Sequence, residues 1–517
     1  MSTIRWNTVV FLLAAVLLCS CTTTRIPELA PPLAGTDDGL TPTQFREHVL
    51  MFDFRGKLLD PFSSSGSRSE MGMTGYQQVA EAAKQGGQAA PTTVDTEEEY
   101  FRRVIDGIER RQKEKGRVEV LFFFHGGLNT RAAALERAAE QIVAMRKDKP
   151  DLYPVFVNWE TSLPASYKDH LLWLRNGQDT YRSGLVLAPF VFLGDVGKSV
   201  LDIPVANYMQ FKEQRRHWRK DELKASDFVR VGTDCREDQA LVFRAGPAED
   251  PTKGQVIRSN AVSVITTILT KWWVAGVLSA TGGKAWASML YTSDRLFYTD
   301  DELHRPYEYR GFVTGSGGLS RFLRGLSTVL KPEDNIILVG HSAGAIPASK
   351  IVRMFGESLP IRTLVYMAPA ATIDELKDGG GVAEFLRRSP VVDGKPTRRL
   401  YILTLHERAE VTERFYLDLT PRGTLLAWLD EFIQPKHSEF PGMMMGRARN
   451  LRLHAHHIPC EIRQQISITA FAEQITPRPK DQQQPQRHSS FGKLAYWKET
   501  TWQPQYADIV KKDQKPE

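Results

Sequence analysis

Short apolar runs alternate with amphipathic segments along most of the chain. Several runs are rich in branched and aromatic side chains, as in strands buried on both faces of a sheet. These runs lie at residues 118–124, 154–159, 336–339, 362–367 and 399–405. Segments with helical spacing lie between them, for example at residues 96–115 and 131–146. This alternation predicts an α/β fold with a mostly parallel central sheet and helices on both faces.

The alternation breaks between residues 181 and 310. Residues 185–193 and 261–280 are strongly apolar, and the charged stretch 211–224 lies between them. Residues 185–193 are too few for a membrane-spanning helix, and Lys271 and Gly276 interrupt the second run. We expect a large, mainly helical insertion that either packs on the body as a subdomain or forms a lid or membrane-facing surface.

The first residues form a targeting signal rather than part of the fold. Arg5 precedes the apolar residues 9–18, and the following residues 18–21 (LCSC) resemble a bacterial lipobox. In a lipobox the last cysteine, here Cys21, is lipidated and becomes the mature N-terminus. Thr22 follows instead of aspartate, which favours the outer membrane. The alternatives are a plain secretory signal and a short uncleaved anchor.

Composition changes divide the chain into six segments. Residues 22–42 are rich in proline, threonine and glycine, which is typical of a tether. The predicted segments are the signal peptide at 1–21, the tether and irregular N-terminal region at 22–97, the first part of the core at 98–180, the helical insertion or lid at 181–310, the second part of the core at 311–497 and a polar tail at 498–517.

Overall composition is that of a globular protein. The 517 residues are 42% hydrophobic and 25% charged, which is ample for one large core or two domains. The net charge of +6 is mild for this length, and no basic run is interleaved with aromatic residues, so we expect no nucleic-acid partner. A protein partner is not indicated.

The cysteines and histidines give little sign of metal. Cys235 and Cys460 lie in the expected body, where an exported protein permits a disulfide and two separate thiols are the alternative. His454, His456 and His457 are clustered without a suitably placed carboxylate. We therefore expect neither a metal nor a cofactor.

The most specific motif is NIILVGHSAG at residues 335–344. The five-residue pattern G-x-S-x-G is common by chance, but here a buried-type strand precedes it and a helix follows. This context predicts a nucleophile elbow with Ser342 at its apex. Gly340 and Gly344 are expected where strand and helix backbones pass too closely for a Cβ atom. Ser342 should then have a strained backbone and an exposed hydroxyl.

With this motif the chain resembles the α/β-hydrolase superfamily, and within it a group of poorly characterised bacterial serine hydrolases. The resemblance covers residues 117–497, apart from the insertion. It implies an α/β-hydrolase fold, with a catalytic triad in the chain order nucleophile, acid, histidine. It also implies an acyl-enzyme mechanism that needs no cofactor.

The resemblance extends to an oxyanion hole. His125, Gly126 and Gly127 resemble the family's His-Gly loop after the third strand, where backbone N–H groups act. The expected donors are the N–H groups of Gly127, with Leu128 as the alternate, and of Ala343. A plain glycine turn in which Asn129 caps the next helix is the competing interpretation.

The acid is expected in the loop after residues 399–405. Glu407, with alanine two residues later, fits the family spacing best, although the family usually has aspartate. Glu410 is the alternate acid and Glu413 a third candidate. All of them could instead be surface charges paired with arginines such as Arg408.

The base is expected to be His488. It follows the polar stretch 477–487 and opens a His-Ser-Ser-Phe run similar to the family's late histidine loop. His437 has a similar context but comes too soon after the acid loop. A solvated loop histidine is the alternative for His488. Trp159 and Tyr167 are candidates to line the cleft.

Together these patterns predict a lipid-anchored serine hydrolase of the cell envelope, facing the periplasm from the outer membrane. Its expected substrate is a carboxylic ester or lipid-like acyl ester, and the membrane is its partner through the lipid at Cys21. An acyltransferase with the same nucleophile and a non-catalytic lipoprotein on a hydrolase scaffold are the alternatives.

Overall fold

The computed structural model describes most of the body of the chain. The described residues are 40–61, 96–127, 129, 131–175, 178–179, 184–218, 235, 241–245, 274–304, 315–413, 421–433, 443–472 and 485–502. The predicted signal peptide, Cys21, Leu128 and His437 lie outside them.

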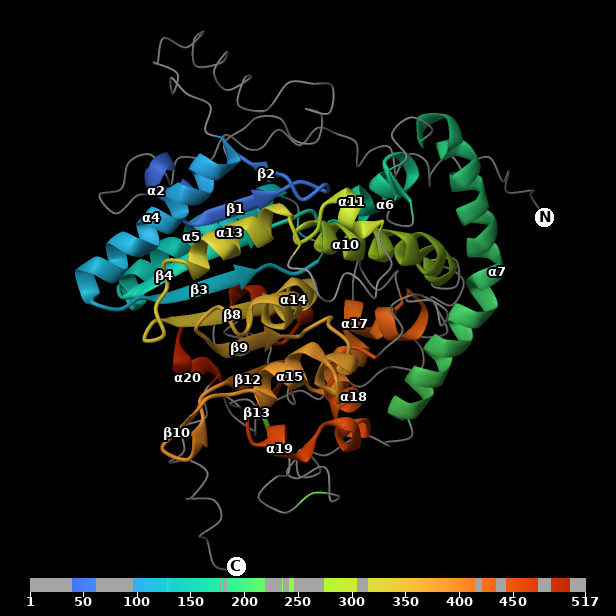
Figure 1. The fold of residues 1–517 in the computed structure, drawn as a ribbon. Helices are drawn as coiled ribbons and strands as arrows, with labels where there is room; N and C mark the ends of the chain where they lie inside the picture. The colour runs from blue at the N-terminus through green and yellow to red at the C-terminus, as the bar shows by residue number, and fades with distance from the viewer. Residues whose placement is uncertain are drawn as a thin grey trace, which may run out of the picture.

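A nine-stranded sheet forms the centre of the molecule (Figure 1). Its spatial order is β2 (Leu58–Leu59), β1 (Val49–Phe52), β4 (Leu152–Asn158), β3 (Glu119–Phe124), β8 (Asn335–His341), β9 (Ile361–Met367), β12 (Arg399–Leu405), β13 (Ile466–Phe471) and β7 (Val242–Ala245). Every pairing is parallel except that of β1 with β2. The prediction of an α/β protein with a mostly parallel sheet is confirmed.

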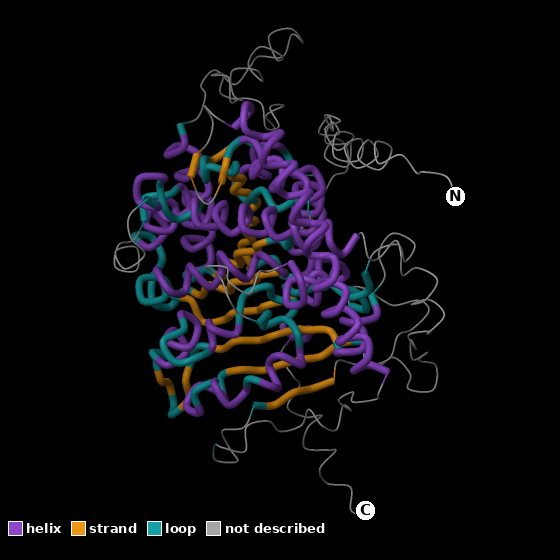
Figure 2. Tube along the Cα trace, turned by 90° about the vertical axis from the view of Figure 1, so that its right-hand side faces the viewer, coloured by secondary structure: helices purple, strands orange, loops and turns teal. Residues whose placement is uncertain are grey.

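The central strands are apolar because both of their faces are covered. Five of the six residues of β3, including Phe122, Phe123 and Phe124, are buried, as are six of the seven residues of β8. Helices lie on both sides of the strands (Figure 2). The larger core helices are α4 (Glu97–Lys115), α5 (Arg131–Asp148), α13 (Gly318–Ser327), α14 (Ala345–Phe355) and α15 (Gly381–Arg387).

Helix α4 shows how local sequence sets an element's ends. Thr96 accepts a hydrogen bond from the Glu99 N–H, and the Glu99 carboxylate accepts one from the Thr96 N–H, which forms a capping box. At the other end Gly116 has φ 78°, the left-handed conformation that terminates helices.

The insertion differs from the expected helical unit. It contains α6 (Leu163–Leu172) at its border, α7 (Gly184–Trp218), η5 (Leu278–Gly282) and α10 (Gly283–Arg295). It also supplies β7, which pairs with β13 and extends the main sheet. The insertion is therefore not wholly helical, because one of its segments completes the edge of the core sheet.

Two terminal segments also join the body. Residues 42–59, which fall in the predicted irregular region, contain α2 (Pro42–Arg46), β1 and β2. In the predicted tail, α20 (Glu499–Trp502) places Trp502 in a buried position. Both segments are ordered because their apolar side chains contribute to the core.

The remaining elements are short. They are β5 (Leu174–Arg175), β6 (Gln178–Asp179), α11 (Asp300–Leu303), η6 (Ser342–Gly344), η7 (Ile373–Leu376), β10 (Val391–Val392), β11 (Lys395–Pro396), α16 (Glu407–Thr412), α17 (Leu425–Trp428), η9 (Leu429–Ile433), α18 (Ala448–Leu453), η10 (Ala455–His457), α19 (Cys460–Arg463) and η11 (His488–Lys493). Of the helices that the structure describes, none has the length and apolarity to cross a bilayer.

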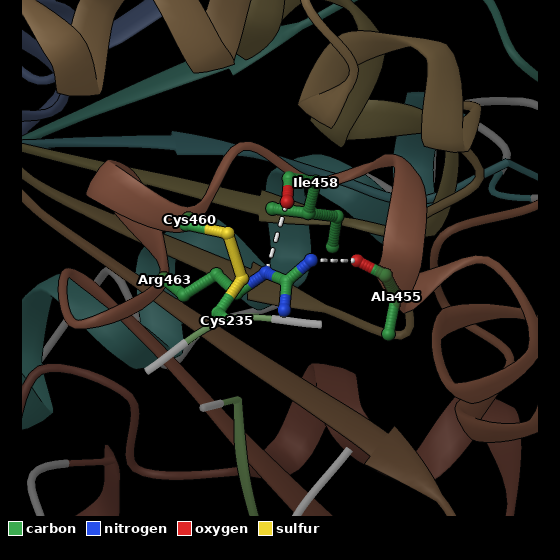
Figure 3. Close-up of a disulfide and its surroundings, with 5 residues drawn as sticks. All are labelled: Cys235, Ala455, Ile458, Cys460 and Arg463. Atoms are coloured by element: carbon green, nitrogen blue, oxygen red, sulfur yellow. Dashed lines mark hydrogen bonds between the residues drawn. A yellow bond between two sulfur atoms is a disulfide. The ribbon is translucent and has the colours of Figure 1, made fainter. Parts of the chain in front are cut away.

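A disulfide joins the insertion to the C-terminal half of the core (Figure 3). Cys235, seven residues before β7, is bonded to Cys460 at the start of α19, with a Cα–Cα distance of 5.8 Å and a sequence separation of 225. Beside it the buried Arg463 guanidinium donates to the Ile458 and Ala455 carbonyls, both at 2.9 Å. Of the two alternatives for these cysteines, the structure contains the disulfide.

Candidate active site

The order of the strands creates a natural site between β3 and β8. From β3 the chain proceeds outward to β4 on one side, then returns to the other side with β8, β9, β12 and β13. The direction of winding thus reverses between β3 and β8, and crevices form at the carboxyl ends of such strands. His125 directly follows β3, and Ser342 directly follows β8.

The turn at Ser342 has the predicted strain. Ser342 has φ 51°, a left-handed conformation that residues other than glycine seldom adopt. A Cβ atom at position 340 would lie 2.7 Å from Ala345 Cα, and one at position 344 would lie 2.8 Å from the His125 carbonyl oxygen. The steric reason for glycine on both sides of the serine is therefore confirmed.

The predicted exposure of the serine is wrong. Ser342 is only 1% exposed, and later segments of the chain contact it through His488 and Ala370. Its carbonyl accepts a hydrogen bond of 2.9 Å from the Ala370 N–H, in the loop after β9. The turn is thus held by the loop after β9 as well as by its own strand, β8.

His488 lies against this serine. Its Nε2 atom is 2.8 Å from Ser342 Oγ, and both side chains are buried. Burial lowers the pKa of His488 from 6.5 to about 4, so the ring is neutral near pH 7 and can accept the serine proton. The carbonyl of His488 accepts a hydrogen bond of 3.2 Å from His341 Nε2, which joins the late loop to the turn at the end of β8.

The loop after β3 is fixed through one carbonyl group. The Gly126 oxygen accepts hydrogen bonds from His125 Nδ1 at 2.9 Å, Asn129 Nδ2 at 2.9 Å and Thr161 Oγ1 at 3.2 Å. The other ring nitrogen of His125 accepts the Trp159 N–H at 3.2 Å. Burial lowers the pKa of His125 to about 4, which keeps the ring neutral and able to make both bonds.

Because the Gly126 carbonyl is held in place, the orientation of the Gly127 N–H group is also set. The peptide bond is trans, so the Gly127 N–H points opposite to the Gly126 C=O, away from these three donors. A Cβ atom on Gly127 would lie 3.5 Å from Ala343 Cβ, and one on Gly126 would lie 3.0 Å from Ser342 Cβ. The loop therefore lies beside the serine turn, and the predicted donors Gly127 and Ala343 are neighbours.

The expected acid, Glu407, is held elsewhere. Its carboxylate lies 3.2 Å from Arg449 Nε in an ion pair. The alternate, Glu410, is fully buried and accepts a hydrogen bond from the Thr424 hydroxyl through Oε2. Burial raises the pKa of Glu410 to about 8. Neither carboxylate reaches the His488 Nδ1 atom, which has no hydrogen-bond partner in the described part of the chain.

Glu413, the third candidate, is the carboxylate in contact with the histidine residue. Its Oε2 atom accepts the His488 backbone N–H at 2.9 Å. It caps the C-terminal end of α16 and is buried, which raises its pKa to about 7. From the sequence, Glu413 is the weakest of the three candidates, because the family pattern places the acid nearer to the end of the preceding strand, here β12.

Among the described residues, the other candidates make no hydrogen bond to Ser342 or His488, although the Trp159 N–H reaches the His125 ring. The Trp159 side chain is buried, and the Tyr167 hydroxyl donates to Asp195 at 3.0 Å. Rings of His456 and His457 are 3.9 Å apart in η10. Among the described residues no group of three or more potential metal ligands is assembled. Thr161 was not anticipated, since only the fold brings it to the Gly126 carbonyl.

Comparison with known proteins yields no relative for this chain. No family model, no curated protein and no solved structure matches it.

Proposed function

We propose that the protein is a serine hydrolase that cleaves carboxylic esters through an acyl-enzyme at Ser342. The observation that carries the proposal is the 2.8 Å contact between Ser342 Oγ and His488 Nε2, in a buried turn where Ser342 has φ 51°. A neutral imidazole at this distance can serve as the base that a weakly nucleophilic hydroxyl needs.

The fold supports an α/β-hydrolase assignment. The strands β4, β3, β8, β9, β12 and β13 are neighbours in that order, with the glycine loop after β3 and the serine after β8. The glutamates of the 407–413 region follow β12, and His488 follows β13. Nucleophile, acid and histidine thus succeed one another along the chain as they do in that family.

The reaction then proceeds in two halves. His488 Nε2 takes the proton from Ser342 Oγ as the oxygen attacks the acyl carbonyl carbon. The resulting oxyanion is stabilised by the N–H groups of Gly127 and Ala343. His488 returns the proton to the departing alcohol oxygen, and the ester bond breaks. Water repeats the sequence on the acyl-enzyme and releases the acid.

We propose Glu413, rather than Glu407 or Glu410, as the carboxylate that orients His488. Its Oε2 atom accepts the backbone N–H of His488 at 2.9 Å, which makes it the one of the three candidates in contact with this residue. Nδ1 is buried and has no hydrogen-bond partner among the described residues, an arrangement that is costly unless an acceptor is supplied. Glu407 is committed to Arg449.

The proposed location is the bacterial cell envelope, with a lipid on Cys21 in the outer membrane. The disulfide between Cys235 and Cys460 supports export, because such bonds persist in oxidising compartments. The lipobox sequence supports anchoring. An enzyme held at this place would meet lipids and other acyl esters, which is the substrate class we propose.

A fluorophosphonate probe tests the hydrolase proposal. We expect it to label the wild-type chain and not Ser342→Ala. The matched control is Ser349→Ala, which removes a buried serine on α14 whose hydroxyl lies 2.9 Å from Tyr366 and not near a histidine. Labelling of this control should persist. If correctly folded wild-type protein does not react, the proposal fails.

A further inference from the structure

Helix α7 presents its apolar side chains to the outside. A surface helix ordinarily buries its apolar face and exposes its polar one. Seven large apolar or aromatic side chains of α7 are between 52% and 78% exposed: Val186, Phe190, Leu193, Leu201, Val205, Tyr208 and Phe211. Successive members are three, four or eight residues apart, which places them on one face of the helix. A continuous apolar stripe therefore follows the helix.

Two acidic side chains of α7 point into the protein. Asp195 is buried, accepts the Tyr167 hydroxyl at 3.0 Å and lies 3.4 Å from His170 Nε2 on α6. Asp202 accepts the Ser279 hydroxyl of η5 at 2.9 Å. The orientation of α7 is thus fixed by specific contacts, and its exposed stripe is not the result of a loosely placed helix.

The position of α7 leaves this stripe accessible. The helix runs along one edge of the molecule (Figure 1) and packs against α6, η5, η9 and α16 on its inner side. Its 35 residues span roughly 50 Å at 1.5 Å per residue. The helix contains Pro189 and Pro204 and is curved (Figure 1), and its stripe can contact an extended surface along part of this length.

The charges of α7 favour an anionic surface. Among its described side chains, the exposed charged ones are Lys198 and Lys212, and Lys198 also pairs with Asp202 at 2.6 Å. An apolar stripe with aromatic and basic residues toward one end is the pattern of helices that lie in a membrane interface.

We propose that α7 lies in the plane of an anionic lipid surface, with its stripe in the boundary between head groups and acyl chains. A second copy of the chain fits less well. A symmetric antiparallel contact between two such stripes would be centred near Lys198, midway between Val186 and Phe211, and would bring like charges together. A lipid surface offers phosphate groups to the same lysines.

The test places a polarity-sensitive bimane label on the stripe. The full, lipidated chain with Leu201→Cys is reconstituted in vesicles of phosphatidylethanolamine and phosphatidylglycerol. The matched control is Val391→Cys on the β10–β11 hairpin, where valine is 66% exposed and Leu201 is 78% exposed. Brominated acyl chains in the vesicles report contact with lipid.

We expect the emission at position 201 to shift to the blue and to be quenched by brominated lipid, while position 391 stays aqueous. An unshifted emission at 201 would overturn the proposal. So would a shift that brominated lipid does not quench and that depends on protein concentration, because a second copy would then cover the stripe.

The inference is independent of the hydrolase proposal. The label should respond identically in the Ser342→Ala background, where probe labelling is lost. A second readout needs no label: Phe190→Ser with Leu201→Ser should weaken vesicle binding of a chain that also carries Cys21→Ser, without a lower unfolding temperature. Unchanged binding of this variant would count against membrane contact through α7.

Discussion

At the scale of residues, the main question about the site concerns the buried Nδ1 atom of His488. His488 Nε2 contacts Ser342 Oγ, whereas Nδ1 has no hydrogen-bond partner in the described part of the chain. Glu413 accepts the backbone N–H of the same histidine. A histidine that acts as a base needs its tautomer fixed at Nδ1, with the proton there, so that Nε2 can accept. The identity of the carboxylate therefore decides how well the base works.

Replacement of the three glutamates by glutamine should separate them. Glu413→Gln should lower kcat by about 10³ to 10⁴, as loss of the orienting carboxylate does in other triads. Glu407→Gln should leave kcat within about threefold, because an ion pair that is partly open to solvent contributes little. Steady-state hydrolysis of a short acyl ester measures both. Equal effects at positions 407 and 413 would contradict the assignment.

The pH profile gives an independent test of Glu413. Burial raises its pKa to about 7, so the carboxylate forms only as the pH rises through that value. His488, with its pKa lowered to about 4, is already neutral over this range. We expect kcat/KM of the wild type to increase with pH around a midpoint near 7. The Glu413→Gln variant should lack this step, and its persistence there would assign it to another group.

The loop after β3 offers a prediction about the oxyanion donors. Thr161→Val removes one of the three donors that hold the Gly126 carbonyl and leaves the Gly127 N–H less firmly oriented. Because complete loss of a donor costs about 10² or more, we expect kcat to fall by about tenfold, with KM little changed. Thr161→Ser, which keeps the hydroxyl, should recover most of the rate. A loss that appears only in KM would place Thr161 in substrate binding.

At the scale of elements, the hydrophobic pattern predicted the strands that are covered on both faces of the sheet. Residues 118–124 and 336–339 are apolar enough to be recognised as β3 and β8 without any partner. Val49–Phe52 is equally buried, but it is only four residues long and follows a short helix in a region rich in polar residues. Strand β7 contains Arg244 and has a partner on one side only, so its pairing depends on β13.

The disulfide between the segment before β7 and the start of α19 gives a prediction about stability at this scale. Cys235→Ser with Cys460→Ser opens a covalent loop of 225 residues, which removes up to about 5 kcal/mol from the free energy of unfolding by loop entropy. Urea unfolding with and without reductant should show the difference in the wild type and none in the double variant. Equal midpoints in all four measurements would mean that the bond constrains little.

At the scale of the whole molecule, buried acids set the response to pH. Glu410 has its pKa raised from 4.5 to about 8, so the folded protein binds a proton that the unfolded chain releases between these values. This contribution to stability is complete below pH 4.5 and is lost as the pH rises toward 8. The slope is at most about 1.4 kcal/mol per pH unit for one group.

Glu410→Gln should flatten that dependence. The amide is neutral at every pH, so the variant should lose less stability than the wild type between pH 5 and pH 8. Urea unfolding at the two pH values measures the difference. Parallel curves for the two proteins would show that Glu410 does not keep its proton in the folded state.

The candidate site was predictable where it depends on chain order and was not where it depends on packing. Ser342, Gly127 and His488 occupy places that a strand, a loop and a late segment define in sequence. The choice among three glutamates depends on the turn at the end of α16, which directs Glu413 toward His488 and Glu407 toward Arg449. The burial of Ser342 likewise depends on segments that pack over it from elsewhere in the chain.

The place of β7 has a consequence for how the protein is made. This edge strand is encoded more than two hundred residues before β13, its neighbour in the sheet. A chain synthesised from its N-terminus therefore presents β7 long before its partner emerges. Until then the edge of β12 stays open and the Cys235 thiol has no Cys460 to meet. Synthesis of β13, its pairing with β7 and formation of the Cys235–Cys460 bond therefore all come late in maturation.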